Sequence, residues 1–207
     1  MGISYYFAKA IKILHLPAIK NSTIHNTSKV SSATLLVNII MNKYSFIGSN
    51  CTVINTEIGS FCSIADNVII GGAAHPIDWV STSPVFHNGK NILKKNFSNH
   101  PFKTTERTSI KNDVWIGSNC LIKSGVTIEN GAIIGMGSVL TKNVGAYEIW
   151  AGNPAKFIRK RFPEDIINDL IKIAWWEWDD SALKKYSKYI NNPINLIKHC
   201  KIHNQKY

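Results

Sequence analysis

The chain has 207 residues, of which 44% are hydrophobic, and a formal net charge of +11 at pH 7. This length fits one sizeable domain with appendages, and no run of about 18 uncharged apolar residues occurs that would predict a membrane-spanning helix. The basic residues are dispersed and no nucleic-acid motif is present, so an acidic or polyanionic small ligand explains the charge as well as nucleic acid does.

Residues 1–27 are expected to form a short amphipathic helix and a lead-in. Apolar residues at positions 3, 7, 10, 11 and 14 share one helical face. Lysines at positions 9 and 12 interrupt what would be the apolar centre of a secretion signal. We expect this helix to pack on the body of a cytoplasmic protein, with peripheral contact to a membrane surface as the alternative.

The next segment, 28–150, is expected to form a parallel β-helix. An aliphatic residue recurs every six positions, most regularly from Ile116 to Leu140. Asn or Gly follows three places after each, and these residues tolerate left-handed backbone angles. Each unit therefore predicts a short strand and a tight corner, and three units would close a triangular coil. The same pattern, with one step of five, runs from Ile47 to Ile70, and Leu35 and Met41 extend it upstream.

Three of the four cysteines occur at one position of this repeat. Cys51, Cys62 and Cys120 each follow an aliphatic residue by four places, where a small side chain would fill the inside of a corner. This position favours buried apolar residues over metal ligands or disulfide partners. The pattern agrees with a reducing cytoplasm.

The repeat is interrupted by a segment expected to span 72–110, which is rich in Ser, Asn, Pro, His and Lys. A long excursion from a compact solenoid is often functional. It holds three of the seven histidines, His75, His87 and His100. We therefore expect the chemistry of the protein to reside in this segment.

Residues 151–207 are expected to form a basic turn followed by helices. Pro163, Glu164 and Asp165 are typical of the start of a helix, and a second helix is predicted over 180–190. We expect these helices to cap the open end of the coil, where strand edges would otherwise be unpaired. Trp175, Trp176 and Trp178 are expected to pack there.

Three stretches of the sequence resemble the hexapeptide-repeat acyltransferases, in particular the xenobiotic (chloramphenicol and streptogramin) acetyltransferases and the related sugar O-acetyltransferases. These are "DVWIGSNCLIKSGVTIENGAIIGMGSVLTKNV", "AGNPAKFIRKRF", and "HPIDWVSTSPVF" with the later "AWWEW". The resemblance implies a left-handed β-helix and an acetyl-CoA-dependent acetyltransferase. It also implies a homotrimer whose active sites lie between subunits, with the excursion of one subunit supplying the catalytic histidine, His75.

The roles of the candidate catalytic residues follow from acyl transfer to a hydroxyl, which needs a base to remove the proton. Histidine suits this role, since its unperturbed pKa is about 6.5. Asp78 could accept a hydrogen bond from the imidazole or cap the following turn. Trp115 is expected to point off the coil, either beside the reacting centre or in packing. The remaining acceptor-side candidates are Trp79, His87 and His100.

The resemblance also implies a coenzyme A groove between the coils of adjacent subunits. Arginine can hold a phosphate through two hydrogen bonds, whereas lysine acts as a point charge. Lys160 and Arg161 are instead expected to be solvated surface charges. The implied cofactor-binding residues are Gly117, Ser118, Gly135, Met136, Gly137, Thr141, Lys142, Lys156 and Arg159.

No metal is expected. The carbonic-anhydrase-like proteins that share such a coil need three histidines around a metal, two of them five residues apart, and neither position 70 nor position 80 is histidine. The predicted function is O-acetylation of a sugar or a surface polysaccharide. The alternatives are O-acetylation of a xenobiotic and N-acetylation of an amino sugar. Lysines and arginines in the excursion permit an acidic sugar as the acceptor.

Overall fold

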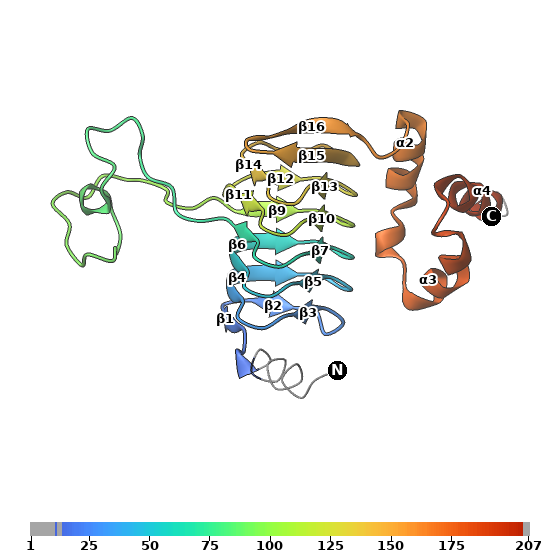
Figure 1. Cartoon of the computed structure of the whole chain (residues 1–207), viewed down its shortest axis with the longest axis horizontal. Helices are drawn as coiled ribbons and strands as arrows, with labels where there is room; N and C mark the ends of the chain where they lie inside the picture. The colour runs from blue at the N-terminus through green and yellow to red at the C-terminus, as the bar shows by residue number, and fades with distance from the viewer. Residues whose placement is uncertain (1–10, 12–13, 205–207) are drawn as a thin grey trace.

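A computed structural model describes residues 11 and 14–204, and its strands stack into a parallel β-helix (Figure 1). Nine strands form one sheet and seven form the other, with every pairing parallel except that of the last two strands. The strands are β1 Ala18–Lys20, β2 Thr23–Ile24, β3 Lys29–Val30, β4 Leu35–Met41, β5 Phe46–Ile47, β6 Thr52–Ile58, β7 Ser63–Ile64, β8 Ile69–Ile70, β9 Thr108–Ile110, β10 Trp115–Ile116, β11 Leu121–Ile122, β12 Thr127–Ile128, β13 Ile133–Ile134, β14 Val139–Leu140, β15 Glu148–Gly152 and β16 Ala155–Lys160.

The six-residue period is confirmed by burial and by register. The aliphatic residues that recur every six positions in the regular tract are each at most 2% exposed: Ile116, Ile122, Ile128, Ile134 and Leu140. Residues 18 apart pair in this tract, as Trp115 does with Ile133. In the first tract the spacing is 17, as between Leu35 and Thr52, because β4 and β6 run through one corner without a break.

The corners adopt the left-handed conformation that the sequence predicts. Asn119 has a φ of 62° and Gly137 has a φ of 71°. Phe61 also has a φ of 62°, although its residue type does not favour this region, so the coil imposes the conformation there. One predicted core residue is wrong. Leu36 is fully buried and Leu35 is 40% exposed, because β4 pairs Leu36 with the inward-facing Val53.

The three cysteines of the repeat are free and buried, as their position predicts: Cys51, Cys62 and Cys120. The Cys62 thiol donates a hydrogen bond to the Lys111 carbonyl at 2.9 Å, and the Cys120 thiol donates one to the Gly135 carbonyl at 3.1 Å. Burial raises the pKa of Cys62 to about 12. These thiols therefore remain protonated packing groups inside the coil.

The element boundaries differ from those expected. Paired strands begin at Ala18 rather than at 28, and the excursion occupies 71–107, since β9 already belongs to the coil. The helix predicted near the N-terminus falls almost entirely outside the described residues. In the described part of the chain, none of the helices has the length and apolar character needed to span a membrane.

The C-terminal helices do not cap the end of the coil as expected. The antiparallel pair β15–β16 covers that end, and the helices lie along the side of the coil (Figure 1). The ring of Trp175 packs 4.9 Å from that of Phe61 at a coil corner. Pro163 precedes the first helix, as predicted. The helices are α2 Glu164–Ile173, η2 Trp175–Glu177, α3 Asp180–Tyr186, η3 Ser187–Tyr189 and α4 Pro193–Asn204, and a further η1, Pro84–Phe86, lies in the excursion.

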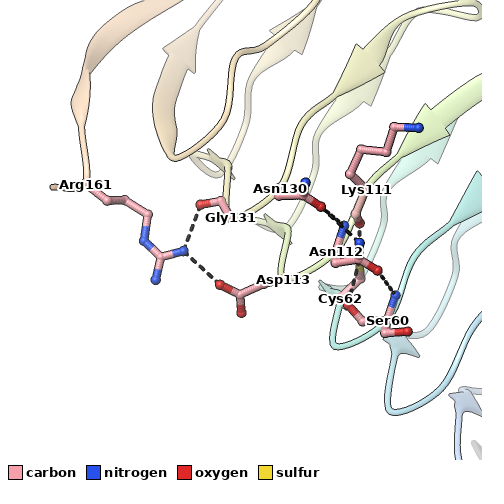
Figure 2. A network of polar contacts seen from close by, with 8 residues as sticks. All are labelled: Ser60, Cys62, Lys111, Asn112, Asp113, Asn130, Gly131 and Arg161. Atoms are coloured by element: carbon pink, nitrogen blue, oxygen red, sulfur yellow. Dashed lines mark hydrogen bonds and ion pairs between the residues drawn. The ribbon is translucent and has the colours of Figure 1, made fainter. Parts of the chain in front are cut away.

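Arg161 is a structural residue, contrary to the expectation that it is solvated. Its Nη1 donates to Asp113 at 3.0 Å and to the Gly131 carbonyl at 2.8 Å (Figure 2). Its guanidinium also lies over the rings of Tyr147 and Phe162. These contacts fasten the chain after β16 to two successive coil corners. Lys160 likewise forms an ion pair with Glu164, so neither charge is merely solvated.

Candidate active site

The excursion, called the arm from here on (residues 71–107), leaves the coil at a point that requires glycine. Gly71 has a φ of 87°, and a Cβ added there would lie 2.4 Å from the Ile54 carbonyl oxygen. The two legs of the arm meet immediately beyond, where the Ala74 N–H donates to the Thr104 carbonyl at 2.6 Å. The arm then projects from one side of the coil (Figure 1). His75 therefore lies at the rigid base of a projecting segment.

The tautomer of His75 is set by the main chain. Its Nδ1 lies 2.8 Å from the Thr82 carbonyl oxygen. A carbonyl oxygen only accepts hydrogen bonds, so Nδ1 carries the proton and Nε2 retains a lone pair. The side chain is exposed, which leaves Nε2 accessible to a substrate. Thr82, not Asp78, is therefore the partner of Nδ1, and sequence reasoning missed it because a backbone carbonyl has no signature in the side-chain sequence.

Two of the acceptor-side candidates line one cavity of about 700 Å³ in the arm. Trp79 packs edge-on against His100, with ring centroids 5.7 Å apart, and Asp78 and Phe86 also line the cavity. The wall thus combines the rings of Trp79 and Phe86 with the apolar residues Val80 and Pro101, and Asp78 and His100 add a carboxylate and an imidazole. Such a cavity can hold an apolar molecule that carries a few polar groups.

His87 does not line this cavity, although its main chain pairs with that of His100. It is 4% exposed, its Nδ1 lies 3.1 Å from the Asn88 carbonyl, and its ring packs 5.6 Å from that of Phe102. Its position is that of a packing residue in the small core of the arm. Of the three arm histidines, His75 and His100 are exposed and His87 is buried.

The Trp115 ring points off the coil, as predicted. Its side chain is 54% exposed on the outer face of β10, and the residue pairs with Ser63 on one side and Ile133 on the other. Trp115 therefore adds a flat apolar surface to one outer wall of the coil. The structure places it on a different part of the chain from His75, which belongs to the arm.

The glycines assigned to cofactor contact have a structural reason of their own. The backbone N–H groups of Gly117 and Gly135 donate at 2.8 Å to carbonyls of the next coil. A Cβ added to Gly117 would lie 2.6 Å from the Met136 backbone nitrogen, and one added to Gly135 would lie 2.9 Å from the Ala151 Cβ. Both glycines are therefore needed for coil stacking, and neither offers a free N–H donor.

Gly137 differs because a Cβ added there would have no neighbour within 4 Å. Met136 beside it is 75% exposed, and Ser118 one coil below is half-buried. The corner at Gly137 thus leaves open space next to an exposed apolar side chain. This is the part of the predicted groove that a bound molecule could approach closely.

Thr141 lines a second cavity, of about 320 Å³, at the base of the arm. Ala74 lines it as well, so the cavity lies one residue from His75. Lys103 and Lys123 add positive charge, and Glu106, which lies 3.7 Å from the Lys103 ammonium, adds one negative charge. Lys142 is exposed nearby in sequence, and Lys156 and Arg159 are exposed on β16. Sequence reasoning missed Lys123, which the 18-residue coil spacing places one coil below Thr141. Each of these exposed cations could contact a phosphate group.

Within the described part of the chain, no group of three or more His, Cys, Asp or Glu side chains is arranged to hold a metal ion.

Comparisons with known protein families agree with this architecture. Residues 107–142 match the family described as bacterial transferase hexapeptide (six repeats). A probable macrolide acetyltransferase from Lysinibacillus sphaericus is 43% identical over 148 residues, which cover 70% of this chain and 78% of that protein. A chloramphenicol acetyltransferase from Escherichia coli is 40% identical over 137 residues, which cover 64% of each chain.

Two solved structures share the fold. The polySia-specific acetyltransferase NeuO has a TM-score of 0.50 and 27% identity, with 81% of this chain and 67% of that chain covered. AntD, an N-acyltransferase from Bacillus cereus solved with dTDP-4-amino-4,6-dideoxyglucose and coenzyme A, has a TM-score of 0.58 and 21% identity, with 81% and 96% covered. At that identity the likeness to AntD concerns the fold alone.

Proposed function

The chain belongs to the hexapeptide-repeat acetyltransferases, and from this premise we propose that it transfers the acetyl group of acetyl-CoA to a hydroxyl, with His75 as general base. The observation that carries this proposal is the hydrogen bond from His75 Nδ1 to the Thr82 carbonyl. In the neutral ring it leaves the lone pair on Nε2, and the side chain is exposed, as removal of a hydroxyl proton requires.

The proposed chemistry needs one base that later acts as an acid. His75 Nε2 takes the acceptor's hydroxyl proton while the oxygen attacks the acyl carbon. The resulting imidazolium keeps its Nδ1–H on Thr82 and returns the Nε2 proton to the departing sulfur. Acetyl-CoA supplies the acyl group on a reactive thioester. The main-chain partner holds the ring in one orientation through both proton transfers, which is the contribution of Thr82 to the mechanism.

Residues of the coil and of β16 are proposed to hold the coenzyme. Its phosphates fit the exposed cations Lys142, Lys156 and Arg159, and its narrow arm fits the open corner at Gly137. The other proposed contact positions are Gly117, Ser118, Gly135, Met136 and Thr141. Because the N–H groups of Gly117, Gly135 and Gly137 are engaged within the coil, these glycines would act by leaving room, not by donating hydrogen bonds.

We place the acceptor in the aromatic cavity beside Trp79 and His100. Its wall favours an apolar molecule that bears a hydroxyl, and the similar macrolide and chloramphenicol acetyltransferases support a xenobiotic acceptor. This reverses the order expected from the sequence, in which sugars came first. A sugar polymer is the second candidate, and it is supported by the similarity to the polySia-specific acetyltransferase and by Lys94, Lys95 and Lys103 in the arm.

The active site is proposed to form between subunits of a homotrimer. The arm projects from its own coil, and a base carried on a projecting segment needs a second surface to complete a water-excluded site (Figure 1). The coil wall that bears Trp115 and Met136, both exposed large apolar side chains, would provide that surface in a neighbouring copy.

One acceptor screen tests both proposals about chemistry and acceptor. Purified protein would be mixed with acetyl-CoA and with a macrolide, chloramphenicol, neutral oligosaccharides or oligosialic acid, and free thiol release would be followed. We expect turnover with a hydroxylated antibiotic that is abolished when its hydroxyl is absent. Turnover only with oligosialic acid would favour the second candidate. An amino sugar would be added as a further acceptor, and an N-acetyl product identified by NMR would contradict O-acetylation.

A further inference from the structure

The far end of the arm, residues 90–97, presents apolar and basic side chains together and is called the arm tip below. Ile92 is 91% exposed, Leu93 is 60% exposed and Phe97 is 67% exposed. Lys90, Lys94 and Lys95 stand exposed among them. Single exposed apolar residues are ordinary on protein surfaces, but a cluster at one loop end marks a contact surface.

The arm tip is held in shape by side-chain hydrogen bonds. The Asn91 amide donates to the Lys95 carbonyl at 3.1 Å, and its oxygen accepts from the Leu93 N–H at 2.9 Å. Asn96 donates to the His87 carbonyl at 2.7 Å. The turn that displays Ile92 and Leu93 is therefore ordered before it meets a partner, which lowers the entropy lost on binding.

A groove of about 510 Å³ lies on the opposite side of the molecule, between a coil corner and the C-terminal helices. Aromatic rings pack along it, including Phe61 against Trp175 at 4.9 Å. It is called the helix–coil groove below, and its apolar wall includes Tyr44, Phe61, Trp175, Trp178, Leu183 and Ile190.

The charge of the helix–coil groove changes along α3. Asp180 lines the groove at the start of the helix and accepts a hydrogen bond from the Tyr44 hydroxyl at 2.5 Å. Glu177 and Asp179, both exposed, flank Trp178 in the sequence. The Lys43 ammonium donates to the Trp178 carbonyl, so one cation lies among the carboxylates at the start of α3. The last turn of α3 instead carries Lys184 and Lys185. An apolar segment with lysines at its edge would therefore fit with those lysines toward Asp180.

We propose that the arm tip of one copy of the chain docks in the helix–coil groove of a second copy, with Ile92 and Leu93 in the groove and the tip lysines facing the start of α3. The arm and the groove lie on opposite sides of the coil along the longest axis of the molecule, so the tip cannot reach its own groove (Figure 1). The inference rests on the proposed homotrimer and specifies one of its contacts.

Such a contact joins two different surfaces and is therefore head-to-tail. Two different surfaces on opposite sides of one subunit form a head-to-tail interface, and repetition of that interface generates a cyclic oligomer when the rotation closes. Each arm would then be anchored at its base by its own coil and at its tip by a neighbour. This double anchoring would hold His75 at a fixed position over the neighbouring coil.

The test is photo-crosslinking between differently labelled copies. A benzophenone amino acid would be incorporated at position 92, in unlabelled chain mixed with ¹⁵N-labelled chain, and crosslinked peptides would be identified by mass spectrometry. We expect mixed-isotope crosslinks to residues 175–190 or to the coil corner at Tyr44 and Phe61. The same amino acid at position 158, where Ile158 is 58% exposed on β16, is the matched control and should not label that groove.

Charge reversal adds a second readout. Lys94→Glu and Asp180→Lys should each lower the crosslink yield several-fold at low salt, and the two together should restore it. Asp165→Lys reverses an exposed charge on α2 and should leave the yield unchanged. Circular dichroism confirms that each variant is folded.

The outcomes separate this inference from the proposed function. Crosslinks to another surface of a trimer, or to vesicles of phosphatidylglycerol added to the mixture, would overturn the docking and leave the enzyme proposal intact. Sedimentation as a monomer would overturn the docking and the intersubunit site together. If the protein forms the expected crosslink but transfers no acetyl group in the acceptor screen, the result would count against the enzyme proposal alone.

Discussion

The coil and the arm are built by different means. In the coil, residues that point inward are repeated at fixed intervals, and backbone hydrogen bonds join each strand to the coils on either side. In the arm, single side chains such as Asn91 and Asn96 bond to the backbone, and large apolar residues such as Ile77 and Val80 remain exposed. The coil, built from repeats, therefore provides a rigid surface, whereas the arm, which has no repeat, carries the proposed chemistry.

The largest effect should follow from removing the proposed base from the arm, which tests whether the arm carries the chemistry. His75→Ala should lower kcat by about 10²- to 10⁴-fold, the usual contribution of a positioned general base. Because His75 is exposed, the free energy of unfolding should not change. Steady-state kinetics and urea unfolding would measure both effects. His25→Ala, which removes an exposed histidine near the N-terminal end of the coil, should leave both unchanged, and equal losses in the two variants would refute the assignment.

The corresponding change in the coil is Gly117→Ala. The added Cβ would meet the Met136 backbone nitrogen at 2.6 Å, so we expect a loss of about 1–3 kcal/mol in the free energy of unfolding. Gly137→Asn is the matched control, since Asn119 occupies the same corner one coil below with a φ of 62°. Its stability should change by less than about 0.5 kcal/mol. A raised KM for acetyl-CoA in the folded Gly137→Asn variant would support the coenzyme groove, and an unchanged KM would contradict it.

A smaller effect on catalysis should follow from removing hydrogen bonds that order the arm while His75 is left unchanged. Asn96→Ala removes the hydrogen bonds to the His87 and Gly89 carbonyls. We expect kcat/KM to fall roughly tenfold, because a slightly misplaced catalytic group is costly. The unfolding of the coil should be unaffected. Asn99→Ala is a control three residues further along the arm, and a similar loss there would point to general sensitivity of the arm.

The smallest change concerns Tyr147, which is 1% exposed and whose hydroxyl is buried without a hydrogen-bond partner among the described residues. Tyr147→Phe should alter the free energy of unfolding by less than about 1 kcal/mol at pH 7. Burial raises the pKa of Tyr147 from 10.0 to about 12, so the unfolded chain loses this proton first as pH rises. Stability should therefore fall between pH 10 and about 12, and less steeply in the variant. Identical pH profiles for the two proteins would contradict this.

Prediction from sequence succeeded where the repeat dictates the structure. The inward positions of Ile116 and Ile122, the left-handed corner at Asn119 and the burial of Cys62 all follow from one period. It failed where the outcome depends on tertiary contacts. The sequence places Arg161 in a cluster of basic residues and so predicts a solvated charge. In the structure, hydrogen bonds to Asp113 and to the Gly131 carbonyl hold its guanidinium against the coil.

The candidate site was predictable only in part, for the same reason. A motif identified His75, but its partner is the main-chain carbonyl of Thr82, which no residue type signals. Trp79 and His100, 21 positions apart in sequence, meet in one cavity because the arm folds back on itself. The position of the helices beside the coil, with their groove, depends on the packing of Phe61 and Trp175 and could not be read from helix patterns.

The central claim is that the arm of one copy acts over the coil of another, and subunit mixing tests it most directly. His75→Ala removes the base, and Met136→Glu places a charge on an exposed coil position in the proposed groove without disturbing the core. Refolded together in equal amounts, the two inactive variants should recover about a quarter of wild-type activity, since one interface in four would pair an intact arm with an intact coil. Activity no higher than that of either variant alone would contradict the claim.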